Sequence, residues 1–154
     1  MHRNPAAFAI LAGGLIAGTL DAIYATTFAS MRGMEPMKLW QLVASGWLGE
    51  SAYQGGWSVA ALGLVSHYGI MLCAAGLFYS AAKAFPFLVR RPIVSAMVFG
   101  VGMYLAMNFV ILPLSAYPHP FRFVPWLVAL NLAVHMFLVG VPISLSTRAA
   151  RVAA

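Results

Sequence analysis

The feature that most constrains the fold of this chain is a set of four long apolar stretches. They cover residues 6–29, 57–82, 92–114 and 124–145, and a helix needs about 20 residues to cross a bilayer. A sheet with open edges would leave backbone groups unpaired in hydrocarbon, so we expect helices. The sequence therefore predicts an all-α membrane protein, a four-transmembrane-helix bundle formed by residues 1–154 as a single membrane domain.

The charge content agrees with this fold. Only 8% of the residues are charged and 62% are hydrophobic, whereas about a quarter of the residues in soluble domains are charged. The net charge of +6 comes from residues that lie between the apolar stretches and do not form a single basic face. The expected partner is therefore the lipid bilayer, and nucleic acid is not expected.

The distribution of lysine and arginine predicts the orientation. The side that carries both termini has six of these residues and the opposite side has three, so the positive-inside rule puts both termini in the cytoplasm. The six are Arg3, Lys83, Arg90, Arg91, Arg148 and Arg151, and the three are Arg32, Lys38 and Arg122. The first stretch is longer than the apolar core of a secretory signal, so it is expected to be retained.

The connection between the first two spans is too long for a simple turn and predicts a short interfacial helix at about 36–48. Pro36 can begin this helix and Gly49 can end it. Trp40 and Trp47 suit the headgroup region. Two roles are open, a surface anchor, which is favoured, and a lid over a cavity.

Small residues mark a packing face on the first span. Gly14 and Gly18 form a GxxxG element that Ala22 continues at the next four-residue step. Such a face lets two helices approach closely in lipid. Its partner is either another helix of this chain or a helix of another subunit.

Asp21 is the strongest single-residue signal, because it is the only acidic residue within a predicted span. Ionisable residues inside the membrane are costly and are usually functional. At about 1.5 Å per residue, polar residues of the other spans reach similar depths, about 9 to 16 Å below the outer surface. The predicted buried polar cluster consists of Asp21, His67, Tyr104, Asn108, Asn131 and His135.

Several short motifs resemble the YagU-like family of four-helix bacterial inner-membrane proteins. They are AGTLD at residues 17–21, His67, NFVILPLS at 108–115 and NLAVH at 131–135. The resemblance implies the fold and a multi-pass location in the bacterial inner membrane, and it implies no chemistry, since no activity is established for the family. The first outer loop differs from the family in length and composition.

The sequence contains no obvious catalytic constellation. A Gly-rich phosphate loop, a His-Glu-x-x-His motif and paired carboxylates are all missing, and no metal site is indicated. An enzyme is therefore the less favoured class. Hydrogen bonds in the polar cluster could also serve only to hold the helices in register.

Three functions remain open. The first is a proton-responsive transport or accessory protein in which Asp21 titrates beside His67 or His135, within a homodimer or larger membrane complex. The second is a b-type haem protein with His67 and His135 as axial ligands and Gly63 making room for the macrocycle. The third is a structural assembly subunit whose polar cluster only fixes helix register.

Overall fold

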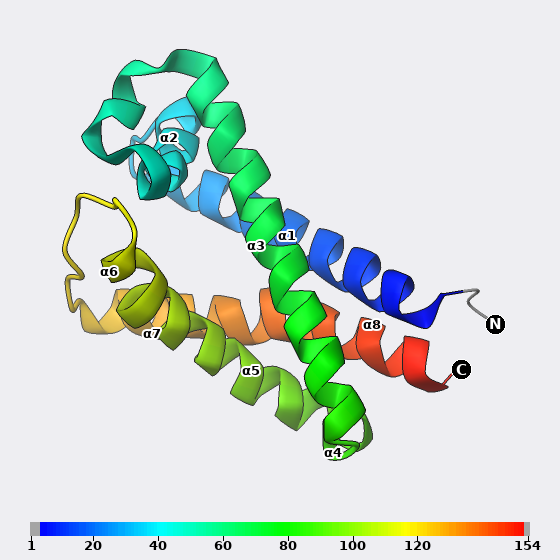
Figure 1. Ribbon diagram of the computed structural model, residues 1–154. Helices are drawn as coiled ribbons and strands as arrows, with labels where there is room; N and C mark the ends of the chain where they lie inside the picture. The colour runs from blue at the N-terminus through cyan, green and yellow to red at the C-terminus, as the bar shows by residue number, and fades with distance from the viewer. Residues whose placement is uncertain (1–3, 153–154) are drawn as a thin grey trace.

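The computed structural model describes residues 4–152, and every regular element in that range is helical (Figure 1). Four helical segments are long and apolar enough to cross a membrane, which confirms the predicted fold class. They are α1 (Pro5–Met31), α3 (Gly56–Ala84), Pro92–Leu114 and Pro125–Arg151. Arg3, which the charge count uses, lies outside the described residues.

The third and fourth of these segments each contain a π-helical turn. The third comprises α5 (Pro92–Ala106), η2 (Met107–Ile111) and α6 (Leu112–Leu114). The fourth comprises α7 (Pro125–Val134), η3 (His135–Gly140) and α8 (Val141–Val152). Pro113 and Pro142 follow the two turns closely, and a proline inside a helix removes one backbone donor, which favours such local irregularity.

Two opposite ends of the bundle can be distinguished. Residue 4, the short helix α4 (Phe87–Arg90) and the end of α8 lie at one end, here called the terminal end (Figure 1). The helix α2 (Pro36–Leu48), the 3-10 turn η1 (Gly49–Gln54) and the connection 115–124 lie at the other, here called the loop end. The amide N of Ala116 donates to the carbonyl O of Gly46 at 2.9 Å and ties the two loop-end connections together.

The small-residue face of α1 packs against α3 of the same chain. A Cβ added at Gly14 would lie 3.0 Å from Cα of Leu72, and one added at Gly18 would lie 2.8 Å from the ring of Tyr68. Such close approach requires glycine at both positions. The packing face of α1 therefore meets another helix of the same chain.

The fourth segment extends beyond the predicted end at residue 145. Ser144, Thr147 and Ala150 are buried, although Ser144 and Thr147 lower the hydropathy from which the end was predicted. Ser144 Oγ donates to the carbonyl O of Pro92 at 2.8 Å, and Ala150 packs with Ala9 of α1. Packing against α1 and α5 therefore continues the helix past the point where hydropathy alone ends it.

Helix α2 has the predicted bounds and packs along the first turns of α3. Pro36 begins it, and Gly49, with φ of 60°, ends it. A Cβ at Gly63 would overlap the carbonyl group of Trp40, so glycine allows the two backbones to touch. Gln41 is fully buried in this contact, and its Nε2 donates to the carbonyl O of Gly56 at 3.0 Å.

Candidate functional site

Asp21 of α1 faces His67 of α3 where these two helices pack closely. Its Oδ2 lies 3.9 Å from Nδ1 of His67, and the two side chains are 16% and 9% exposed. The other ring nitrogen of His67, Nε2, lies 2.9 Å from the carbonyl O of Gly18. The glycine that permits close packing thus also supplies a partner for the imidazole.

This carbonyl determines which nitrogen of His67 carries the proton. A carbonyl oxygen only accepts, so Nε2 of His67 donates to Gly18 and is protonated. In the neutral ring Nδ1 then presents a lone pair to Asp21, and in the charged ring it presents an N–H. At 3.9 Å the two groups are at ion-pair distance, so the charge of each depends on that of the other.

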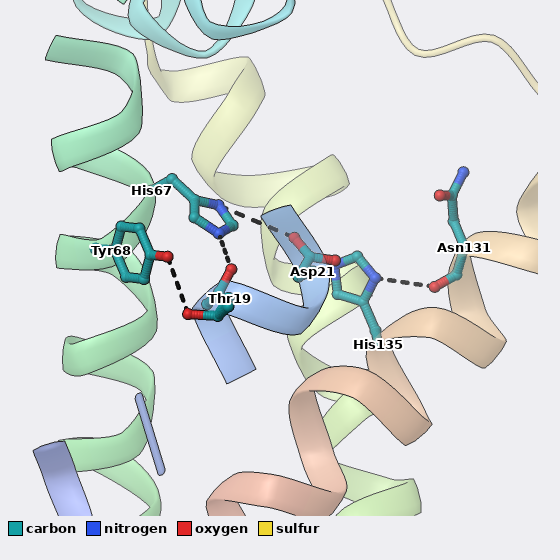
Figure 2. Close-up of polar contacts among 7 residues, drawn as sticks. Thr19, Asp21, His67, Tyr68, Asn131 and His135 are labelled. Carbon is teal, nitrogen blue, oxygen red and sulfur yellow. Dashed lines mark hydrogen bonds and ion pairs between the residues drawn. The ribbon is translucent and has the colours of Figure 1, made fainter. Parts of the chain in front are cut away.

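His135 lies on the other side of Asp21. Its Nδ1 lies 2.9 Å from the carbonyl O of Asn131, so this nitrogen donates and Nε2 is left for other contacts. The carboxyl group of Asp21 interacts electrostatically with both histidines. Figure 2 shows Asp21 between His67 and His135, which come from α3 and η3.

The remaining predicted residues lie beside His135 and do not contact Asp21 through hydrogen bonds. The Tyr104 ring meets the His135 ring edge-on, with centroids 5.6 Å apart. Asn108 Nδ2 donates to the carbonyl O of Tyr104 at 2.9 Å, within its own helical segment. The side chain of Asn131 points away from His135 (Figure 2). In the described residues, neither asparagine side chain links two helices by a hydrogen bond.

These residues line a cavity of about 900 Å³ between η2–α6 and α7, here called the polar cavity. Tyr104, Asn108, Asn131 and His135 form one part of its lining. The connection 115–124 forms another part at the loop end of the bundle. The full lining is Tyr104, Met107, Asn108, Leu112, Pro113, Tyr117, Pro118, His119, Pro120, Phe121, Arg122, Leu127, Val128, Asn131 and His135.

The loop part of the lining carries positive and neutral polar groups. His119 Nε2 lies 2.9 Å from the hydroxyl O of Tyr53, which holds the connection against η1. Burial, and to a lesser extent the nearby Tyr53, raises the pKa of the Tyr117 phenol above its usual value, so this group is neutral at physiological pH. Arg122 is exposed and lines the same part of the cavity.

Two contributors to the site were missed from the sequence. Trp40 of α2 packs on His67, with ring centroids 5.5 Å apart and an angle of 64°, so α2 covers the Asp21–His67 pair. That is the position of a lid, while Trp47, 71% exposed, remains suited to anchoring. Thr19 Oγ1 lies 3.0 Å from the hydroxyl O of Tyr68 (Figure 2). The sequence contains no sign that Thr19 and Tyr68, which are 49 positions apart, form a hydrogen bond. The helical spacing of Trp40, by contrast, could have suggested that its side chain faces the other helices.

The haem hypothesis does not fit this arrangement. Ligation of one haem by His67 and His135 needs both rings to face a common space with a free nitrogen directed at the iron. Nε2 of His67 is occupied by the Gly18 carbonyl, and Asp21 lies where the macrocycle would have to be. The room expected beside Gly63 is filled by the backbone of Trp40.

No family model matches this chain, and no curated protein and no solved structure is significantly similar to it. The resemblance to YagU-like proteins therefore stays a prediction from short motifs. The function is therefore inferred from the geometry of the site.

Proposed function

We propose that this chain is a proton-responsive transport or accessory protein, and that it lies in the bacterial inner membrane, the location that its resemblance to YagU-like proteins implies. The observation that carries the proposal is the position of Asp21 between two histidines inside an apolar bundle. A carboxyl group within a span is costly unless it titrates or is paired. Asp21 can titrate, and it can also pair with the two imidazole groups that face it.

The polar cavity gives this group a route to one side of the membrane. His135 lines the cavity and interacts with Asp21, which in turn faces His67. A proton that enters at the loop end can reach His135 first and then be shared with Asp21. Under the positive-inside assignment the loop end faces the periplasm and both termini face the cytoplasm. The protein would then sense or admit protons from outside.

In the part of the chain that the structure describes, the packing at the terminal end is apolar. Ala9, Tyr79 and Ala150 pack together there as a small apolar core. Transport across the whole membrane therefore calls for a homodimer or a larger complex, or for a movement of the helices. Proton-dependent assembly with a partner requires neither, and it is the accessory form of the same proposal.

The decisive experiment follows the histidines by NMR in detergent micelles during a pH titration. The chain has four histidines, so selective ¹⁵N labelling gives a simple spectrum. In Asp21→Asn we expect the titrations of His67 and His135 to differ from those of the wild type, because the carboxyl group that faces both rings is gone. His119, beside Tyr53 at the loop end, is the internal reference. Glu50→Gln is the matched control, since Glu50 is an exposed acid.

A flux measurement separates the transport form from the accessory form. Purified protein is reconstituted in liposomes that contain a pH-sensitive dye, and acidification is followed after a pH jump. Wild-type flux that Asp21→Asn abolishes supports transport, and wild-type vesicles without flux support the accessory form. If Asp21→Asn leaves both the flux and the histidine titrations unchanged, the proton role of Asp21 is wrong.

The structural subunit remains the second candidate, and one observation favours it. The hydrogen bond from His67 to the Gly18 carbonyl joins α1 to α3 and would hold their register whatever the state of Asp21. This candidate predicts that wild-type vesicles show no flux and that Asp21→Asn leaves the stability and the assembly of the protein as they are, even where the loss of charge alters the histidine titrations. Flux and pH-dependent assembly therefore distinguish the two functions.

A further inference from the structure

We propose that the polar cavity binds a small organic anion, with Arg122 and the Asn108–Asn131–His135 group as its two points of recognition. The inference deepens the proposed function and rests on it only for the coupling to protons. The shared chemistry of the ligand is an anionic head, carboxylate or phosphate, attached to a short apolar part.

The charges around the cavity select for an anion. Its lining includes Arg122, His119 and His135 and no aspartate or glutamate. Tyr117 is neutral, because burial raises the pKa of its phenol. Among the described residues Arg122 has no ion-pair partner, so its guanidinium group is available to a ligand. A cation at the loop part of the lining would meet like charges or neutral groups.

Polar groups deeper in the cavity also lack partners. The side chain of Asn131 makes no hydrogen bond within the described residues, and Asn108 uses only its Nδ2, leaving Oδ1 free. His135 uses only Nδ1, so its Nε2 is free. Polar groups that lie at membrane depth without partners are expected to be satisfied by a ligand or by water. Convergent groups of this kind are what orient a small molecule in a pocket.

The other walls are apolar, and they set the rest of the ligand's chemistry. Leu112, Leu127 and Val128 line the space between the polar groups. The volume of about 900 Å³ is in the range of small-molecule sites. An inorganic anion would leave these side chains without contacts, so an anion with a short hydrocarbon part fits better.

The state of His135 couples the ligand to the proton. Since Nδ1 donates to Asn131, an anion can bind Nε2 as an acceptor only when His135 is charged. The titratable groups that face His135 are Asp21 from α1 and Tyr104 from α5. Asp21 also faces His67, so the carboxyl group and the two imidazole groups are electrostatically linked. Binding of the anion therefore takes up a proton and is tighter at lower pH.

The test uses ¹⁵N-histidine NMR on the full chain in nanodiscs, with butanoate as the probe and butanamide as its neutral counterpart. We expect butanoate to shift the resonances of His119 and His135, which line the cavity, more than that of His67, which does not. Butanamide should bind at least tenfold more weakly. Equal binding of the two probes, or shifts confined to His67, would overturn the proposal.

Two charge variants locate the site. Arg122→Gln should weaken butanoate binding at least fivefold, whereas Arg32→Gln removes a loop-end cation that does not line the cavity and should leave binding unchanged. The His67 resonance reports correct folding in each variant. Unchanged affinity in Arg122→Gln contradicts the assignment of the cavity.

The source of the anion and the link to the proton are read from the same titrations. If the natural ligand is a lipid headgroup, nanodiscs that contain phosphatidylglycerol will compete with butanoate and phosphatidylcholine nanodiscs will not.

In Asp21→Asn, butanoate binding should persist with a smaller pH dependence. Butanoate binding together with unaltered histidine titrations in Asp21→Asn would refute the proton role and keep the anion site. Altered titrations without butanoate binding would refute the anion site alone.

Discussion

The contact of α2 with α3 makes a quantitative prediction through a matched pair of glycines on one helix. At Gly63 an added Cβ would overlap the carbonyl group of Trp40, whereas at Gly69 it would meet no atom within 4 Å. The atoms that oppose Gly63 are backbone, so they cannot turn away as a flexible side chain does. In Gly63→Ala the whole of α2 has to move outward, and Trp40 loses its contact with His67.

The magnitude follows from two opposing effects. Alanine stabilises a helix interior by about 1 kcal/mol relative to glycine, and this gain applies at both positions. Overpacking a close contact costs about 1 to 3 kcal/mol and applies only at Gly63. Gly69→Ala should therefore be stabilised by up to about 1 kcal/mol. Gly63→Ala should range from neutral to about 2 kcal/mol destabilised.

The assay is unfolding in mixed micelles of dodecyl maltoside and sodium dodecyl sulfate, followed by far-ultraviolet circular dichroism. The difference between the two variants isolates the overpacking cost, because their helix propensities change equally. The NMR resonance of His67 should move in Gly63→Ala and stay in place in Gly69→Ala. Equal free energies of unfolding for the two variants would refute the contact between α2 and α3 and, with it, the covering of His67.

The same reasoning applies to two further matched pairs in the mixed-micelle assay. Gly100→Ala should be about 1 to 3 kcal/mol less stable than Gly102→Ala, because a Cβ at Gly100 would overlap the η3 backbone and one at Gly102 meets no atom within 4 Å; equal stabilities would contradict the packing of α5 on η3. Thr147→Val should stabilise by about 1 kcal/mol, since its buried Oγ1 has no partner among the described residues. Ser144→Ala should destabilise by about 1 kcal/mol, since its Oγ donates to Pro92. The same sign of change for Thr147→Val and Ser144→Ala would refute this assignment of partners.

The spans and the short helix α2 could be predicted because the bilayer and the turn residues impose them locally. Hydrocarbon requires runs of apolar residues, and Pro36 and Gly49 bracket α2. The end of α8 could not be predicted in this way. Thr147 is a polar residue and lowers the local hydropathy, but packing against other helices buries it fully. Hydropathy depends only on composition and takes no account of this packing.

The sequence predicts which polar residues share a depth in the bundle, but it does not predict which of them are in contact. Depth depends on rise along a helix, which the sequence provides, whereas contact depends on the rotation of each helix about its axis. Asp21 meets His67 because Gly18 brings α3 close, and the asparagines lie beside the polar cavity and form no hydrogen bond between helices. The π-helical turn that begins at His135 changes the direction in which the following side chains point. Pro142, just after this turn, is the sequence feature that could have indicated it.

The packing face and the candidate site are therefore two uses of the same stretch of α1. The absence of a side chain at Gly18 lets Tyr68 approach, and the carbonyl of the same residue then accepts from His67. That hydrogen bond assigns the proton of the imidazole to Nε2 and leaves Nδ1 facing Asp21, one turn further along α1. A larger residue at position 18 would meet the ring of Tyr68 and disturb the packing that holds His67 on the Gly18 carbonyl. Close packing at this position is consequently a condition for the proton chemistry that we propose for this protein.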